Sequence, residues 1–263
     1  MIKIEKRGKK MTIDKKRAGE WAKRLLVYVA GMLLIACGVT LSRSTDLGVS
    51  PVNSIPNVLS LRFPALSMGT WVILVFAFFI LVQAAILLKG FKWHAVFQLV
   101  SSTLFGYLVD FTNWLGGMVL PASQGAAVKC AFIAVSTVVI ALGIFMYLEA
   151  NVMSMPGEGV TLALSKRTGL KVSTCKIVFD VSVVTVALAL SFLFFGRLHG
   201  VGVGTAVIAV CVGFVMKPIA RFLKAPLKRF MFGQKTETSD GGGVAACAAA
   251  VSSETAENVS EEE

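Results

Sequence analysis

Six long runs of almost uncharged, apolar residues constrain this chain more than any other feature. They lie at about 25–41, 68–88, 95–115, 130–148, 177–195 and 201–216. Each run is close to the roughly 20 residues that an α-helix needs to cross ~30 Å of hydrocarbon. Backbone polar groups in lipid must be satisfied within the segment, which favours helices, and the sequence lacks the alternating strands of a membrane barrel. We therefore predict an all-α membrane protein with about six transmembrane helices.

The charged residues are few and they collect at the ends and in the connectors. Only 16% of the 263 residues are charged, against about a quarter in a soluble domain. Ten basic residues lie within residues 3–24, and a second group follows the last run: Lys217, Arg221, Lys224, Lys228 and Arg229. Such clusters attract anionic lipid headgroups, at about 1 kcal/mol per residue near the surface. Without interleaved aromatics or a known binding module, they indicate a membrane surface and not nucleic acid. The expected partners are thus the lipid bilayer and anionic lipids at its cytoplasmic face.

The connectors also predict an orientation. With the N-terminus inside, the connectors that carry Lys89, Lys92, Lys166, Arg167 and Lys171 face the cytoplasm, and the segment 113–128, free of Lys and Arg, lies outside. We expect a multi-pass protein of the bacterial plasma membrane with both termini cytoplasmic. Residues 1–24 form a basic cytoplasmic segment and 25–222 the membrane domain. The Gly-rich, acidic stretch within 223–263 predicts a cytoplasmic, largely disordered tail.

The membrane domain contains an internal repeat. A shift of 105 residues aligns 38–62 with 143–167, and pairs Gly38 with Gly143 and Pro51 with Pro156. The halves then span about 25–118 and 128–222, with three runs in each. Because three is odd, the second copy must enter the membrane upside down, as in the inverted repeats of many secondary transporters.

Each aligned segment directly follows the first span of its half. Pro51 and Pro156 suit the first turn of a short helix. A half-helix of this kind can direct backbone N–H groups at a polar ligand inside the membrane, although a surface loop with an interfacial helix is the alternative. The polar residues around the two breaks are the candidate substrate-binding residues: Asp46, Ser50, Asn53, Asn57, Glu149, Asn151 and Glu158.

Two further charges fall at the start of the fifth run. Lys176 and Asp180 are four residues apart, so they share one helix face and are expected to form an ion pair, within the membrane or at its cytoplasmic surface. The five cysteines and two histidines lack the spacing of a metal site. No hydrolase, nucleotide-binding or metalloprotease motif is present. We expect no enzyme, no cofactor and no metal.

Several short motifs resemble a known family. They are DLGVSP at 46–51, SMGT at 67–70, PGEGVTLALSKRTGLKVS at 156–173 and GVGVGT at 200–205. In these the chain resembles the YczE/YyaS/YitT-type bacterial integral membrane proteins, especially the YczE-like branch. The resemblance implies a multi-pass protein with a transport role. The family pattern has an acid shortly after the first-half proline, where this chain has Asn53; Glu158 keeps the acid in the second half.

Together these features favour a secondary transporter or permease for a small solute, with alternating access around the two broken-helix segments. Two alternatives stay open at this point. One is a substrate-binding membrane subunit of a multi-component importer, and the other is a non-transporting membrane scaffold or regulator. Self-association into a homo-oligomer is open as well.

Overall fold

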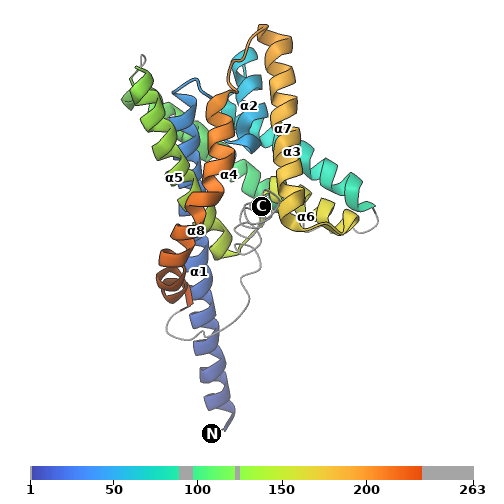
Figure 1. The fold of residues 1–263 in the computed structure, drawn as a ribbon. Helices are drawn as coiled ribbons and strands as arrows, with labels where there is room; N and C mark the ends of the chain where they lie inside the picture. The colour runs from blue at the N-terminus through green and yellow to red at the C-terminus, as the bar shows by residue number, and fades with distance from the viewer. Residues whose placement is uncertain (1, 89–96, 122–124, 233–263) are drawn as a thin grey trace, which may run out of the picture.

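The computed structural model describes residues 2–88, 97–121 and 125–232. Within these residues all regular secondary structure is helical (Figure 1). The helices are α1 (Ile2–Arg43), α2 (Pro51–Arg62), α3 (Met68–Leu87), α4 (Gln98–Val119), α5 (Ala126–Ala150), α6 (Pro156–Thr168), α7 (Val172–Phe195) and α8 (Val203–Phe232). The predicted tail beyond 232 and the connector with Lys89 and Lys92 lie outside the described residues.

Five of these helices are long and apolar enough to cross a membrane. They are α1 from Gly19 onward, α3, α5, α7 and α8. The predicted third run falls on α4, which has 22 residues and includes polar side chains such as Ser101, Asp110 and Asn113. The structure confirms an all-α, multi-pass membrane protein.

The helix ends differ from the predicted boundaries at two places. Helix α1 continues through the predicted start of the membrane domain at residue 25, and α8 continues ten residues past its predicted end at 222. In both cases Lys and Arg beyond the apolar run are good helix formers, and α8 continues past Pro218 and Pro226 as well.

The two predicted breaks are confirmed as short helices. Helix α2 has 12 residues and α6 has 13, and Pro51 and Pro156 open their first turns. Helix α6 ends at Gly169, whose φ of 75° is the left-handed conformation that favours glycine. Neither helix is long enough to cross a bilayer, and they lie toward opposite ends of the molecule, α2 high and α6 low in Figure 1.

Helices α1 and α5 form the central pair of the packed core, and the second half of α1 packs along α5, while the first half projects from the body. Helix α4 packs on α1 and α3, and α8 packs on α5. The short helices cross between the halves, so that α2 contacts α7 and α6 contacts α3. The largest fully buried side chains are Met32, Phe76, Phe105, Phe145 and Tyr147.

Two glycines allow the central pair to approach closely. A Cβ added to Gly31 would lie 2.7 Å from the backbone nitrogen of Tyr147 and 2.8 Å from the carbonyl oxygen of Gly143. A Cβ added to Gly143 would lie 2.6 Å from the carbonyl oxygen of Gly31. Small residues at such contacts are typical of membrane helices, whose association depends on close van der Waals packing.

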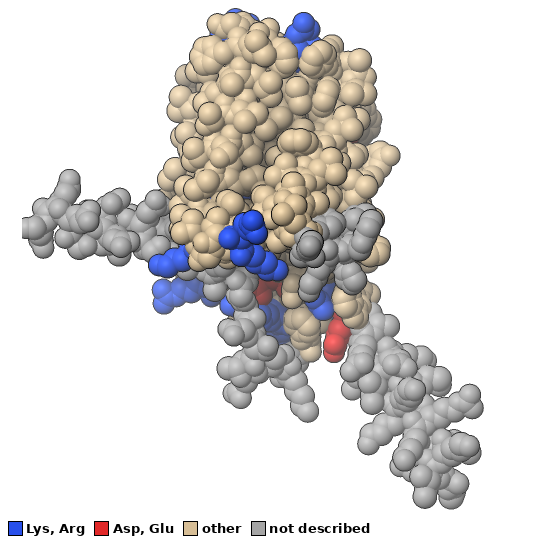
Figure 2. All heavy atoms as spheres, turned by 90° about the vertical axis from the view of Figure 1, so that its right-hand side faces the viewer, with Lys and Arg blue, Asp and Glu red and all other residues tan. Residues whose placement is uncertain are grey.

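The surface separates an apolar body from a charged end. On the face shown in Figure 2, the body is almost free of charge, and most of the Lys and Arg residues collect below it, with a few at the top. The lower end is where α1 begins and α8 ends (Figure 1). A wide uncharged band with charges beyond it is the surface expected of a protein surrounded by lipid.

Candidate functional site

At the first break the structure brings together three of the predicted site residues. The backbone N–H of Asn53 donates to the Ser50 carbonyl at 3.0 Å, and its side-chain amide donates to the Ser50 hydroxyl at 2.9 Å. The Asn57 amide donates to the Gly200 carbonyl at 2.7 Å and so ties α2 to the connector between α7 and α8. Asp46 stays apart, exposed beyond the end of α1.

At the second break the predicted residues lie less close together. Asn151 ends α5 in the left-handed conformation and is exposed, while its carbonyl accepts a hydrogen bond from Arg24. Glu149 is buried, and one of its carboxyl oxygens has no hydrogen-bond partner. Glu158 lies in the first turn of α6 and is partly buried.

The environment of Glu158 favours its protonated form. Burial raises the pKa of the Glu158 carboxyl to about 7, Asp180 adds to this rise, and Lys176 and a backbone hydrogen bond from Met155 oppose it. On the side of α1, Glu158 interacts electrostatically with Tyr28. A carboxyl group with a pKa near neutrality can gain or lose a proton under physiological conditions.

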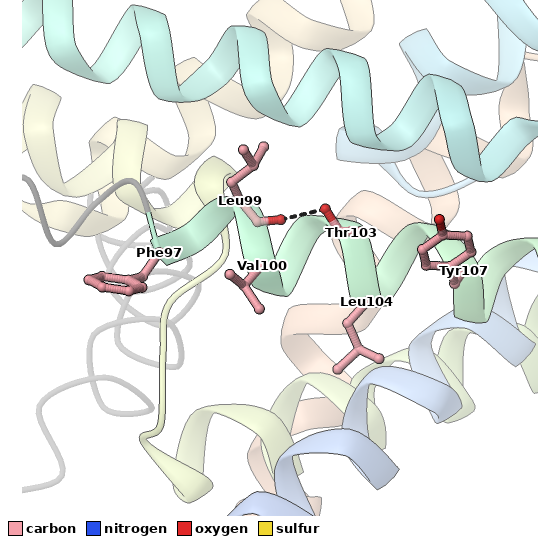
Figure 3. A pocket seen from close by; sticks show the side chains of 6 residues that line it. All are labelled: Phe97, Leu99, Val100, Thr103, Leu104 and Tyr107. Atoms are coloured by element: carbon pink, nitrogen blue, oxygen red, sulfur yellow. Dashed lines mark hydrogen bonds between the residues drawn. The ribbon is translucent and has the colours of Figure 1, made fainter.

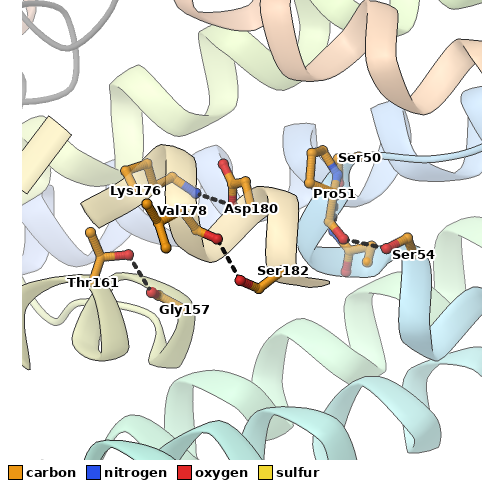
Figure 4. Close-up of polar contacts among 10 residues, drawn as sticks. Ser50, Pro51, Ser54, Gly157, Thr161, Lys176, Val178, Asp180 and Ser182 are labelled. Carbon is orange, nitrogen blue, oxygen red and sulfur yellow. Dashed lines mark hydrogen bonds and ion pairs between the residues drawn. The ribbon is translucent and has the colours of Figure 1, made fainter. Parts of the chain in front are cut away.

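The predicted ion pair is confirmed. The Lys176 ammonium donates to the Asp180 carboxylate at 2.8 Å, and both side chains are mostly buried. Their helix, α7, packs against both α2 and α6. Figure 4 shows the pair between the start of α6, at Gly157, and the start of α2, at Pro51.

The structure also assembles polar residues that the sequence did not single out. The Tyr28 hydroxyl donates to Ser101 at 2.8 Å, and the Ser101 hydroxyl points to the Met153 sulfur at 3.0 Å. The Gln98 amide donates to the Ser154 hydroxyl at 3.3 Å. With Gln83, these residues surround the connector into α6 and the first turn of α6. We call Tyr28, Gln83, Gln98, Ser101, Met153 and Ser154 the α6 polar cluster.

Two side-chain oxygens in the α6 polar cluster are buried without a partner. Gln83 and Gln98 are only 8% and 6% exposed, and the Oε1 atom of each accepts no hydrogen bond. Both amides face Gly159, where a Cβ would collide with the Gln83 oxygen and lie 3.0 Å from the Gln98 nitrogen. A buried acceptor without a partner costs about 1–3 kcal/mol, so such an atom calls for an explanation.

A hollow lies elsewhere, on the outer face of α4 (Figure 3). It has a volume of about 610 Å³ and is lined by Phe97, Leu99, Val100, Thr103, Leu104 and Tyr107. The Thr103 hydroxyl donates to the Leu99 carbonyl, which leaves a largely apolar lining open to the outside. We assign this hollow to lipid contact and place the candidate site at the α6 polar cluster.

The described residues contain no group of three or more His, Cys, Asp and Glu side chains that could hold a metal ion. The polar groups present at the candidate site are carboxyl, amide and hydroxyl groups.

Comparison with known proteins agrees with this architecture. The chain is similar to an uncharacterized membrane protein, YczE, of Bacillus subtilis (strain 168), with 24% identity over 74% of this chain and 84% of the relative. It is also similar to an uncharacterized protein, YyaS, of the same organism, with 28% identity over 72% of this chain and 88% of the relative. No solved structure matches the chain. The model of a family of unknown function, DUF6198, matches residues 22–221, and the chain belongs to this family.

Proposed function

We propose that this protein is a secondary transporter or permease for a small polar solute and performs no chemistry on that solute. It crosses the bacterial plasma membrane six times as two inverted repeats, with both termini in the cytoplasm. The observation that carries the proposal is the reciprocal packing of the two halves around the short helices, described below.

The central helices contact each other reciprocally. A Cβ on Gly143 would meet the Ile35 side chain at 2.8 Å and the Gly31 carbonyl oxygen at 2.6 Å. In the 105-residue alignment Gly143 pairs with Gly38, Ile35 with Ile140 and Gly31 with Ser136. A Cβ on Gly38 would in turn lie 2.5 Å from the Ile140 side chain and 3.1 Å from the Ser136 carbonyl oxygen. Reciprocity of this kind is expected when two related halves pack about a two-fold axis.

The two short helices at the breaks also have matching hydrogen bonds and contact each other. The N–H of Asn53 donates to the carbonyl three residues earlier, and so does the N–H of Glu158, 105 residues later. The two short helices also meet at their first turns, because a Cβ on Gly157 would lie 3.4 Å from the side chain of Val52, its equivalent in the first half. These contacts support a two-fold axis that passes between α2 and α6.

The sixth span in this proposal is α4. Its 22 residues would measure about 33 Å, which is enough to cross the hydrocarbon. It packs against α1, the first helix of its half, as α8 packs against α5. Its one charged side chain, Asp110, accepts hydrogen bonds from the Gly69 N–H and the Ser67 hydroxyl at the start of α3. The carboxylate is thus bonded to protein and does not face lipid alone.

This arrangement supports alternating access. Helices α2 and α6 reach the centre from opposite ends, and each contacts the other half, α2 on α7 and α6 on α3. A rocking motion of one half against the other would open the region between them first to one side and then to the other. The excess of Lys and Arg at the end where α1 begins favours the cytoplasm for that end (Figure 2).

Transport by the protein alone is the decisive experiment. Purified protein in liposomes, adsorbed on a solid-supported membrane, would be exposed to small amines, amino acids, sugars and carboxylates. We expect a solute-dependent current or dye-detected proton movement that protein-free liposomes lack. Absence of flux for all four classes would favour the importer subunit or the scaffold.

The inverted topology is tested separately. Epitope tags at Ser60, at the end of α2, and at Ser165, near the end of α6, should report from opposite sides of the cell membrane. Tags that report from the same side would overturn the inverted repeat.

A further inference from the structure

The two halves differ in polarity at three aligned positions around their short helices. In the 105-residue alignment Tyr28 corresponds to Ile133 and Gln83 to Leu188. A shift of 107, two residues more, pairs Gly106 with Gly213 and Ser101 with Ile208. Ile133 and Ile208 are buried. At these positions the half around α2 has apolar side chains and the half around α6 has members of the α6 polar cluster, although α2 itself keeps unpartnered oxygens on Asn53 and Asn57.

The groups left over in the α6 polar cluster are acceptors. The Oε1 atoms of Gln83 and Gln98 have no partner, and Ser101 accepts from Tyr28 while its own proton is directed to Met153. Buried oxygen atoms that accept no hydrogen bond suit a ligand that carries N–H groups or a bare cation.

The charges around the α6 polar cluster favour a cation over an anion. Glu158 lies in the adjacent turn, and Lys176, the cation that interacts with it, is bonded to Asp180. The helix start is also closed, because the N–H groups of Glu158 and Gly159 both donate to the Met155 carbonyl. An anion would find few donors here, whereas a cation would find the unpartnered amide oxygens and the Glu158 carboxyl group, which is ionised in part near neutral pH.

We propose that the α6 polar cluster, together with Glu158, is a binding site for a small monovalent cation. A primary ammonium group suits this site, because its N–H donors match the unpartnered amide oxygens of Gln83 and Gln98. Sodium shares the charge and the preference for oxygen ligands. The inference deepens the proposed transport function, since it names the class of solute or coupling ion, but binding can be measured without transport.

The test measures the thermal stability of the purified protein in detergent. Methylammonium chloride, sodium chloride and choline chloride would be titrated at constant ionic strength, with choline as the bulky cation that does not fit. We expect methylammonium to raise the Tm of the wild type in a saturable way. A rise with sodium alone would identify the ligand as an inorganic cation, and a rise with neither would refute the proposal.

Two matched variants separate binding from a structural role. Gln83→Leu removes one unpartnered oxygen, and we expect the apparent affinity for methylammonium to fall about tenfold or more. The same variant should melt at or above the wild-type Tm without ligand, because a buried amide that lacks a partner is replaced by an apolar side chain. The control is Thr205→Val, which removes a buried, unpartnered hydroxyl at the equivalent start of α8 and should leave the affinity unchanged.

The variants also define the results that would refute the inference. An unchanged methylammonium affinity in Gln83→Leu would exclude the α6 polar cluster as the site. An equal loss in Thr205→Val would place binding on the α2 side or on both sides. Saturable binding without any flux in liposomes would sustain this inference and refute the proposed transport function.

Discussion

The close contact between α1 and α5 predicts that even one added methyl group at Gly31 or Gly143 is harmful. An alanine Cβ at Gly31 would be 2.7 Å from a backbone nitrogen, while ordinary contacts begin at 3.4 Å. Backbone atoms on the facing helix cannot rotate away as a side chain can. The helices must therefore separate by about 0.7 Å along the contact, which forfeits a quarter or more of the attraction between the facing atoms.

The cost can be stated against a matched control. Gly117, on the exposed side of α4, has no atom within 4 Å of an added Cβ, so Gly117→Ala gains the helix propensity of alanine without a clash. Gly31→Ala and Gly143→Ala gain the same propensity but overpack the interface, at a cost of about 1–3 kcal/mol. For a chain of this size that difference corresponds to a Tm lower by roughly 2–12 °C than that of Gly117→Ala.

The assay is thermal unfolding of the purified variants in detergent. Gly38→Ala should fall between the extremes, because its closest contact is the side chain of Ile140, which can repack. The double variant Gly31→Ala/Gly143→Ala should lose less than the sum of the two single variants, since the first change already separates the helices. If Gly31→Ala and Gly143→Ala melt together with Gly117→Ala, the close contact does not contribute to stability and this reasoning is wrong.

Three further predictions concern charged groups. The folded protein holds the Glu158 proton more tightly than the unfolded chain, so the contribution of Glu158 to stability should fall as the pH rises from about 4.5 to 7. Glu158→Gln should remove this pH dependence of stability and any pH-coupled transport. A wild-type pH profile in the variant would exclude Glu158 as the group responsible. Lys176→Met should lower the free energy of unfolding by about 1–3 kcal/mol, because it leaves the Asp180 carboxylate unpaired. The double variant Lys176→Met/Asp180→Leu should lose less. Denaturant titration that finds the double variant less stable than the single one would contradict this prediction. Arg24→Leu should speed amide hydrogen exchange at the end of α5, since Arg24 binds the last carbonyl oxygens there, and unchanged exchange would show that the bonds are dispensable.

The sequence predicted the features that depend on local chemistry. The apolar runs predicted the long helices, Pro51 and Pro156 predicted where the short helices begin, and the spacing of Lys176 and Asp180 predicted their ion pair. Each of these signals lies within a few residues of the structure that it specifies. Hydropathy was less informative for α4, whose polar side chains lower its apolar character although it packs into the core.

The α6 polar cluster was missed for a physical reason. Charged residues interrupt an apolar run visibly, whereas a neutral amide such as Gln83 or Gln98 leaves the run intact. The members of the cluster also come from α1, α3, α4 and the connector before α6, so only the packed structure brings them together. An unusual density of neutral polar residues at the start of the third run was the one signal available.

The proposed duplication accounts for the difference between the halves at Tyr28, Gln83 and Ser101 through a functional demand. Two identical halves about a two-fold axis would place two equal polar regions in the membrane, and each would bear the cost of buried polar groups. A single solute that passes between the halves needs only one such region. At three aligned positions the other half has the apolar residues Ile133, Leu188 and Ile208 in place of Tyr28, Gln83 and Ser101, which lowers that cost there although the oxygens of Asn53 and Asn57 on α2 stay unpartnered. Under the proposed cation site, the unpartnered oxygens of Gln83 and Gln98 are the polar groups that the bound ligand would complete.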